Sequence, residues 1–511
     1  MKHIIKLALR NLKEHKSKTL IISMFILFGV AIVIMGNSFL ESVNRGLEKD
    51  FRANITGDLT ISVRPEKGTS IDVFGVNSTN IADMTGETPK VGAIADLERI
   101  EEILAETNGI KKQSKMISAQ VILSKDAEID FSVLTDDDKD LGVMDLPISM
   151  LFAGEDGTFW ELFPDLKMVE GTYPAPGSNE IIVDTRVIEG FKKSWDKTLE
   201  VGDDVLMASM DGIIREAKVV GIFKPANEYS AMFQSVYCEP GLARAFADLT
   251  YANSFSQDLP DSIDLSISSL SEDDFFGGDD DFFDDIDDDM GILGSSSDFD
   301  SILGDTSLRD ELNKTDDGSW QYIVAKLNNP HADKKIVAEL NKRFKEEGLN
   351  AQAMDWKQAA ISYSGTVEGI SFIFNLLIII LAIVVFIIIM NTMVVSVIER
   401  TSEIGTMRAI GAEKKFVKKL FYSEAIILTS LSSFAGIIFA FICMMIFNSF
   451  NIAITNEIAK MILGGGLLHF SPTPKIIIVT IVVALIGSIL SNRYPVRSAL
   501  RITPIKALSK E

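Results

Sequence analysis

The sequence predicts an α+β membrane protein with four transmembrane helices and a large mixed α/β domain between the first and the second helix. Two observations predict this class. Of the 511 residues, 47% are hydrophobic, yet the formal net charge is −23. These values conflict in a uniform globule, but they fit a chain whose apolar residues form membrane spans and whose acids lie in a solvated part. The length also exceeds that of one typical domain.

Four apolar segments are long enough to cross a membrane as helices, because the hydrocarbon core requires ~20 mostly apolar residues. The predicted spans are residues 19–40, 369–397, 425–447 and 475–490. A secretory signal peptide is the alternative for the first span, but its apolar run is too long and no small-residue cleavage site follows it. No span carries an ionisable residue at its centre, which argues against an ion channel or a proton-coupled carrier.

Lysine and arginine residues gather in three segments outside the spans: 1–18, 398–424 and 491–511. Positively charged segments stay on the cytoplasmic side, so these three segments, and with them both termini, are predicted to be cytoplasmic. The long segment 41–368 and the short loop 448–474 then lie outside the cytoplasm. The sequence therefore predicts a multi-pass membrane protein with one large extracytoplasmic domain.

The extracytoplasmic segment 41–368 shows the patterns of both helices and strands. Apolar residues at helical spacing predict two stalk helices, over 39–51 and 359–370, and two amphipathic helices, over 95–107 and 332–347. Short apolar or alternating runs bounded by turn residues predict strands. The predicted strands are 55–63, 121–123, 130–134, the segments that begin near Ile181, Val205 and Ala217, and 320–327 and 349–354. Gly202 and Gly221 are interpreted as turn and bulge glycines.

Residues 271–305 form an acidic low-complexity insertion in this domain. Dense like charge repels and cannot form a core, so the composition favours disorder. Calcium binding is one alternative, although the spacing lacks the glycine of the usual calcium loop. An acidic–aromatic interaction segment is another.

The segment 398–424, between the second and third spans, carries the ordered pattern Glu-Ile-Gly-x-x-Arg-x-x-Gly-Ala over residues 403–412. A short, specific, charged segment that joins two spans is suited to docking a partner in the cytoplasm. The alternative is a charged amphipathic helix that lies on the lipid surface. Surface binding does not require an ordered pattern, so the sequence favours a docking segment.

No motif for catalysis is present. The sequence lacks a Gly-x-x-x-x-Gly-Lys-Ser/Thr phosphate loop, a zinc-type His-Glu-x-x-His and a Gly-x-Ser-x-Gly nucleophile elbow. We therefore predict no enzyme activity, no catalytic residue, no cofactor and no metal site. The acidic balance argues against nucleic acid as a partner. A disulfide between Cys238 and Cys443 is not expected, because Cys443 lies inside a span.

Three stretches resemble one family, the FtsX-like/MacB-like permeases of type VII ABC transporters. They are the amphipathic segment Leu7–Leu20, the segment Arg400–Ala412 with Phe421–Glu424 after it, and the tail Tyr494–Leu508. The resemblance implies an FtsX-like permease domain over 369–508 and a MacB-like periplasmic core within 41–368. The segment Trp320–Trp356 is similar to the lipoprotein-releasing (Lol-type) branch, from which the acidic insertion and the greater length depart.

The resemblance also implies a mechanism and partners. A separate cytoplasmic ABC ATPase dimer would bind beneath two permease subunits, the second being the same or a related chain, in the bacterial inner membrane. ATP-driven closure would move the extracytoplasmic domains and extract lipoproteins from the outer leaflet of the bilayer. Gly405 and Gly411 would allow close backbone approach and end a helix. The implied ATPase-coupling residues are Glu403, Ile404, Gly405, Met407, Arg408, Ile410, Gly411 and Ala412.

Two other functions stay open within this resemblance. One is efflux of peptides or drugs with a tunnel-forming partner. The other is a signalling module of the FtsX type, which switches an extracytoplasmic hydrolase.

Overall fold

The structure is a computed structural model that describes residues 2–14, 16–78, 90–125, 148–195, 197–209, 212–224, 234–254, 312–454 and 467–501. The acidic segment 271–305, the predicted strand 130–134 and residues 502–511 of the tail lie outside the described residues. Two compact units are present. The described residues up to Asp50 and from Ser362 onward form a helical unit, and those from Phe51 to Ile361 form a mixed α/β unit. The mixed unit is shorter at both ends than the predicted domain 41–368, which included the stalk helices.

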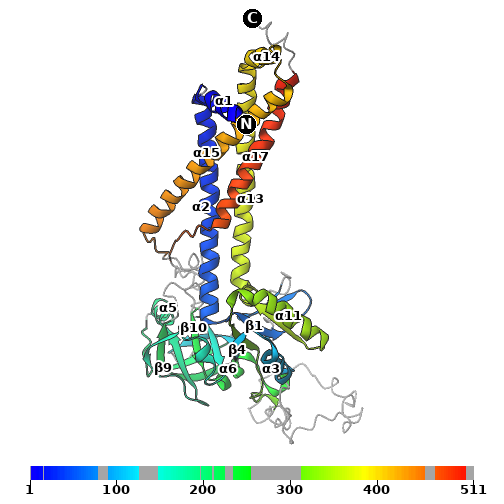
Figure 1. The fold of residues 1–511 in the computed structure, drawn as a ribbon. Coiled ribbons are helices and arrows are strands. Elements are labelled where there is room, and N and C mark those ends of the chain that lie inside the picture. Colours follow the sequence, from blue (N-terminus) through cyan, green and yellow to red (C-terminus); the bar gives the residue numbers. More distant parts are fainter. Residues whose placement is uncertain are drawn as a thin grey trace, which may run out of the picture. The chain divides into compact units, whose positions relative to one another are not determined.

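The helical unit is built from long apolar helices (Figure 1). Its elements are α1 (Lys2–Glu14), α2 (Lys16–Asn54), α13 (Ile361–Glu399), α14 (Thr401–Ala409), α15 (Lys414–Ser449) and α17 (Pro474–Arg501). Of these, α2, α13, α15 and α17 contain segments long and apolar enough to cross a membrane. Each predicted span falls within one of them. The predicted stalk 39–51 lies within α2, which continues to Asn54, and the predicted stalk 359–370 is helical from Ile361, where α13 begins.

Apolar side chains and a close approach at one glycine hold α2 against α15. Buried Ile22, Ile26, Val30 and Ile34 recur every fourth residue and form one apolar cluster with residues of α15. A Cβ atom at Gly436 of α15 would lie 2.7 Å from the carbonyl oxygen of Leu27, so only glycine permits this approach. Hydroxyl pairs add polar contacts inside the unit, as between Thr429 and Ser488 (2.7 Å). Such small-residue packing is typical of membrane helices.

The mixed unit contains a β-α-β-β-α-β arrangement that the sequence patterns predicted only in part. Its elements are β1 (Leu59–Val63), α3 (Leu97–Glu106), β4 (Ile110–Ser124), β11 (Tyr322–Leu327), α11 (Asp333–Glu346) and β12 (Ala351–Asp355). The strand order is β12-β1-β11-β4, with every neighbour antiparallel. This is the ferredoxin-like order. Both helices cover one face of the sheet, because Ile100, Ile103 and Leu104 of α3 share a core cluster with Ile336, Leu340 and Phe344 of α11.

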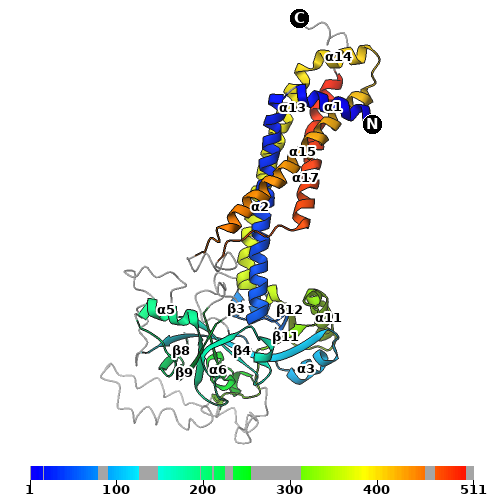
Figure 2. The ribbon, with the colours of Figure 1, turned by 60° about the vertical axis from the view of Figure 1, so that its left-hand side comes forward.

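A closed ring of strands forms the second part of this unit (Figure 2). Its strands are the carboxyl-terminal half of β4, β5 (Ile148–Gly154), β10 (Ser235–Cys238), β7 (Glu180–Asp184), β9 (Ile214–Lys224) and β8 (Asp204–Ala208). The ring closes because β8 pairs with β4. Alternate residues of the ring, such as Leu151, Val183 and Val219, form its core. The long strand β4 therefore belongs to both parts and joins them.

Smaller elements complete the mixed unit. They are the hairpin β2 (Thr69–Asp72) and β3 (Gly75–Ser78), β6 (Lys167–Gly171) paired with β9, and α4 (Phe159–Leu162), α5 (Thr185–Trp195), α6 (Pro240–Ala247), α7 (Tyr251–Ser254), η6 (Pro330–Ala332) and α12 (Trp356–Ala359). The interpretation of Gly202 and Gly221 is confirmed. Gly202 has φ +103° in the turn before β8, and Gly221 lies at a register shift in β9.

One predicted strand begins too early. The predicted strand 55–63 includes residues that instead end α2, since the amides of Ile55 and Thr56 both donate to the carbonyl of Phe51. Gly57 follows with φ +60°, and β1 starts only at Leu59. Ile55 continues the alternation of Leu59, Ile61 and Val63, which is why the segment resembles a strand, but a left-handed glycine after a helix is typical of a helix end.

The free edge of β12 is closed by a side chain. Asn341 of α11 donates to the carbonyl of Ala353 (2.8 Å) and accepts a hydrogen bond from its amide (2.9 Å). Unpaired strand edges invite pairing with other chains, so this amide stands in for a neighbouring strand and protects the edge.

Ion pairs join α3 and α11 on their exposed side. Arg99 Nε lies 2.7 Å from Glu347 Oε2, and Arg343 pairs with both Glu347 (3.2 Å) and Glu106. Side-chain hydrogen bonds from these arginines lower the pKa of Glu347 and of Glu106 below the usual value.

We expect this link to weaken in acid. A carboxyl group with a lowered folded-state pKa stabilises the fold above its ordinary pKa of 4.5, and that contribution disappears as the pH falls through the folded-state pKa. Hydrogen exchange should show α11 better protected in the wild type than in Glu347→Gln at neutral pH, and equally protected in strong acid. Glu339→Gln is the control, because Glu339 is exposed on the same helix and forms no ion pair among the described residues. A difference that persists in strong acid would contradict the assignment.

Candidate functional site

The predicted docking segment folds as a helix, a tight turn and a second helix. Helix α14 ends at Ala409, Gly411 has φ +104°, and the amide of Ala412 donates to the carbonyl of Met407 (3.0 Å). A positive φ favours glycine, so Gly411 ends the helix as expected. Helix α15 already begins at Lys414, so the second half of the segment 398–424 is the opening part of α15 and not a loop.

One face of this segment is buried in the helical unit. Ile404 is 3% exposed and packs in a cluster with Val397, Val417, Phe421 and Val496, and Met407 packs against the same cluster. Gly405 is buried too. The expectation that Ile404 contacts a partner therefore does not fit its position, because a side chain in the chain's own core cannot also cover a partner's surface.

The opposite face is open. Ile410 is 83% exposed, and Gly411 beside it is exposed as well. The Glu403 side chain is 55% exposed, whereas Arg408 and Ala412 are half-buried. Of the predicted coupling residues, these five lie where a partner could reach them, with Ile410 as the apolar tip.

A buried ion pair anchors the segment. Arg400, directly before α14, places Nη1 at 3.0 and 3.3 Å from the two carboxylate oxygens of Glu424 in α15. Both side chains are 5% exposed. Arg400 Nε also donates to Glu403 (3.2 Å), and its guanidinium lies over the ring of Phe421. Arg400 thus connects the exposed face, through Glu403, with the buried interior.

The charges around Arg400 favour its ionised form. Burial by itself lowers the pKa of the guanidinium, but the charge and hydrogen bonds of Glu424, with a further hydrogen bond from Glu403, raise it above the ordinary value on balance. Removing one partner of a buried ion pair leaves the other charge without compensation, which typically costs about 3–5 kcal/mol.

The amino-terminal helix joins the same network. Asn11 of α1 donates to Glu424 Oε1 (2.5 Å), and Ala8 of α1 is fully buried. Helices α1 and α14 lie at the same end of the long helices (Figures 1 and 2). Glu424 therefore ties together α1, α14 and α15.

Arg400 and Glu424 are end residues of the stretches Arg400–Ala412 and Phe421–Glu424, which resemble the family, but the sequence alone indicated no role for either. A signal was present, because Glu424 is the one acidic residue in α15. An acid at the beginning of an apolar span needs a cationic partner. Among the described residues, no group of three His, Cys, Asp or Glu side chains could hold a metal ion.

Comparison with known proteins agrees with this architecture. Residues 375–504 match the family described as FtsX-like permease C-terminal. The macrolide export ATP-binding/permease protein MacB of Campylobacter fetus is 38% identical over 122 residues, which are 24% of this chain and 17% of that protein. Residues 375–504 are therefore similar to FtsX-like permeases. The MacB protein of Mannheimia succiniciproducens is 31% identical over 194 residues, or 37% of this chain and 27% of the relative. The chain thus spans less than a third of the length of these two relatives.

Two solved structures align with this chain. The periplasmic region of MacB from Actinobacillus actinomycetemcomitans covers 62% of this chain and 94% of its own, at 11% identity and a TM-score of 0.26. The extracellular domain of the transporter YknZ from Gram-positive bacteria covers 58% and 99%, at 9% identity and a TM-score of 0.25. Similarity at these TM-scores is too low to support a conclusion about the fold. The description of the fold is therefore based on the strand order given above.

Proposed function

We propose that this chain is a permease, the membrane subunit of an ABC transporter, and that it couples ATP hydrolysis on a separate cytoplasmic ATPase dimer to movement of its extracytoplasmic unit. The observation that carries this proposal is Ile410. A side chain that is 83% exposed on a segment anchored by a buried ion pair is suited to insertion into a partner's groove. The segments 1–18, 398–424 and 491–511 face the cytoplasm in this proposal, and two permease subunits stand over the ATPase dimer.

The buried Arg400–Glu424 ion pair explains how a force applied at Ile410 would be transmitted to the long helices. A partner that binds Ile410 and Glu403 acts on α14, and Arg400 holds α14 to α15 through Glu424. Asn11 holds α1 to the same carboxylate. Closure of the ATPase would then move α1, α14 and α15 together instead of moving α14 alone. The ends of α2 and α13 lead to the mixed unit, which performs the work on the substrate.

For the substrate, we propose lipoproteins in the outer leaflet of the inner membrane. The similarity of Trp320–Trp356 to Lol-type permeases supports this choice. The second candidate is efflux of peptides or drugs, favoured by the two MacB relatives, which are named for macrolide export. An FtsX-type signalling role is the third.

Affinity purification from mild detergent, with mass spectrometry of the retained proteins, tests these functions. An ABC ATPase retained with lipoproteins would support extraction. The same ATPase with an adaptor and an outer-membrane channel would support export, and a cell-wall hydrolase would support signalling. Recovery without any ATPase would contradict the proposal itself.

Ile410→Asp should abolish association with the ATPase while leaving the fold intact, because the side chain contacts almost nothing in its own chain. Co-purification of the ATPase measures this association. Loss of a hot-spot side chain typically weakens the binding free energy of an interface by about 2 kcal/mol or more. Val169→Asp is the matched control, since Val169 is a 60% exposed apolar residue of the mixed unit. If Ile410→Asp retained the ATPase as well as Val169→Asp does, Ile410 would not be the contact.

A further inference from the structure

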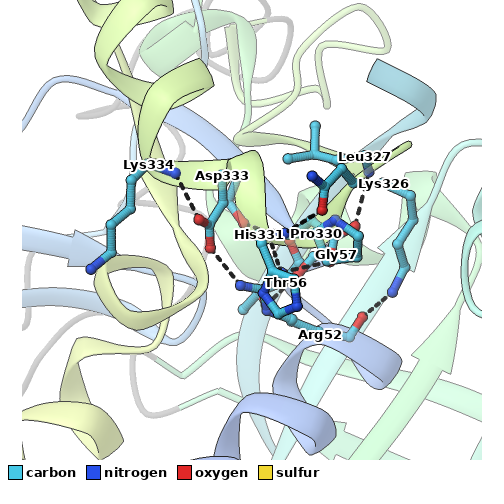
Figure 3. Close-up of polar contacts among 12 residues, drawn as sticks. Arg52, Thr56, Gly57, Lys326, Leu327, Pro330, His331, Asp333 and Lys334 are labelled. Carbon is cyan, nitrogen blue, oxygen red and sulfur yellow. Dashed lines mark hydrogen bonds and ion pairs between the residues drawn. The ribbon is translucent and has the colours of Figure 1, made fainter. Parts of the chain in front are cut away.

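The last turn of α2 belongs to the mixed unit and is held there by a buried cluster of charges (Figure 3). Arg52 donates from Nη1 to Asp58 (3.0 Å) and to the carbonyl of Pro330 (3.1 Å), and from Nη2 to Asp333 (2.5 Å). The three charged side chains are between 6% and 11% exposed. Lys326 donates to the carbonyl of Arg52 itself. We call Arg52, Asp58, Lys326 and Asp333 the Arg52 clasp.

Backbone amides fix both carboxylates of the clasp. Asp58 accepts from the amide of Leu327 at the end of β11 (2.8 Å), and Asp333 accepts from the amide of Lys334 in α11 (2.7 Å). Arg52 is therefore linked to β11 through the Asp58 carboxylate and to α11 through the Asp333 carboxylate, and the backbone amides fix the position of both. The planar guanidinium suits such a bridge between two carboxylates, which a lysine cannot reproduce.

The charges of the clasp balance, with two cations and two anions. Lys326 lies against the carboxyl-terminal end of α2, where the helix dipole favours a cation. Burial lowers the pKa of the Lys326 amine, with Asp58 acting in the opposite direction. Because a buried charge left alone is costly, loss of any one member destabilises the rest.

The other helix that leads to this unit is attached differently. After β12 the chain forms the four-residue helix α12, held by a capping box between Asp355 and Gln358. Ala360 then leaves helical geometry with φ −127° and ψ 43°, and α13 begins at Ile361. A short break of this kind can absorb a change of helix direction, as hinge residues do. Within the described residues, α2 thus enters the unit without interruption, whereas α13 enters through a break.

We propose that Arg52 is a positioning residue that makes α2 the rigid arm of the mixed unit, while the break at Ala360 makes α13 the compliant one. This inference rests on the proposed function for its purpose, because a rigid arm matters only if the membrane helices move. The attachment itself does not depend on any ATPase.

Spin-label distances in the whole 511-residue chain, reconstituted in lipid nanodiscs, test the proposal. A Cys238→Ala/Cys443→Ala background would carry Lys335→Cys on α11, paired with Lys49→Cys on α2 or with Thr366→Cys on α13; all three labelled positions are exposed. The expected result is a narrow α2–α11 distance distribution and a broader α13–α11 distribution. Arg52→Met should broaden the first and leave the second unchanged.

Arg45→Met is the matched control, because Arg45 forms an exposed ion pair with Glu41 on the same helix. It should change neither distribution. If Arg52→Met does not fold, Arg52→Met/Asp58→Asn/Asp333→Asn removes the three charges together and should give the same broadening. Two equally broad distributions in the wild type, or an α2–α11 distribution that neither variant broadens, would overturn the proposal.

Adding the ATPase and nucleotide separates this inference from the proposed function. Nucleotide should shift the α13–α11 distance but not the α2–α11 distance of the wild type. A shift of the α2–α11 distance would overturn the rigid arm. If the ATPase hydrolysed ATP without shifting either distance, the proposed function would fail and the clasp would stand on the nucleotide-free distributions.

Discussion

Arg400→Met should destabilise the helical unit and abolish association with the proposed ATPase partner. The substitution leaves the buried carboxylate of Glu424 without its cation, which costs about 3–5 kcal/mol. It also releases Glu403 and loosens α14 from α15. We expect aggregation on heating in detergent at a lower temperature than in the wild type, and no co-purified ATPase.

Two variants make this expectation specific. Lys415→Met removes a positive charge from an exposed position of the same segment and should have little effect on either measurement. Arg400→Met/Glu424→Met removes both buried charges and should recover most of the thermal stability, because a buried ion pair replaced by apolar groups is often close to neutral. If Arg400→Met melted like Lys415→Met, the ion pair would not anchor the segment.

Gly57→Ala should strongly destabilise the mixed unit. At φ +60° a Cβ atom would lie 2.6 Å from the carbonyl oxygen of Ala325, a backbone atom that cannot move without breaking the pairing of β1 with β11. Conformational strain and the clash together should cost roughly 2–4 kcal/mol. All four tryptophans of the chain (Trp160, Trp195, Trp320 and Trp356) lie within this unit, so thermal unfolding followed by tryptophan fluorescence reports on it.

Gly68→Ala separates the two contributions. Gly68 also has a positive φ, +96°, but a Cβ atom there would meet nothing within 4 Å. The free energy of unfolding of Gly68→Ala should therefore fall only by the cost of placing alanine at a positive φ, about 1 kcal/mol. Equal losses in the two variants would show that the close approach of Gly57 to β11 adds nothing.

The four long helices and the two amphipathic helices of the mixed unit could be predicted because their signals are local. An apolar run of membrane length forms a helix whatever surrounds it, since the bilayer leaves no other way to satisfy the backbone. In α3 and α11, the apolar residues recur at helical spacing, and the predicted inner faces are the buried ones. The turn at Gly57 was missed because a buried helix end and a strand start look alike in hydrophobicity.

The candidate site could be located from the sequence but not oriented. The ordered pattern at 403–412 marked the segment, yet Ile404 and Ile410 were given the same role. Packing buries Ile404 against Val417, Phe421 and Val496, and leaves Ile410 in the open. The difference depends on which helices lie beside α14, and no local pattern contains that information.

By itself, the sequence determined which segments are long and apolar enough to cross a membrane, which helices bury one face, and which segment is suited to docking. Only the tertiary structure decided that β4 belongs both to the ferredoxin-like part and to the closed ring of the mixed unit, that Arg400 meets Glu424, and that Arg52 meets Asp333, 281 residues further along the chain. The physical reason is the range of the interactions. Helix formation and amphipathic spacing depend on neighbours within a few turns, whereas a buried charge must find its partner in whatever element the fold brings to it.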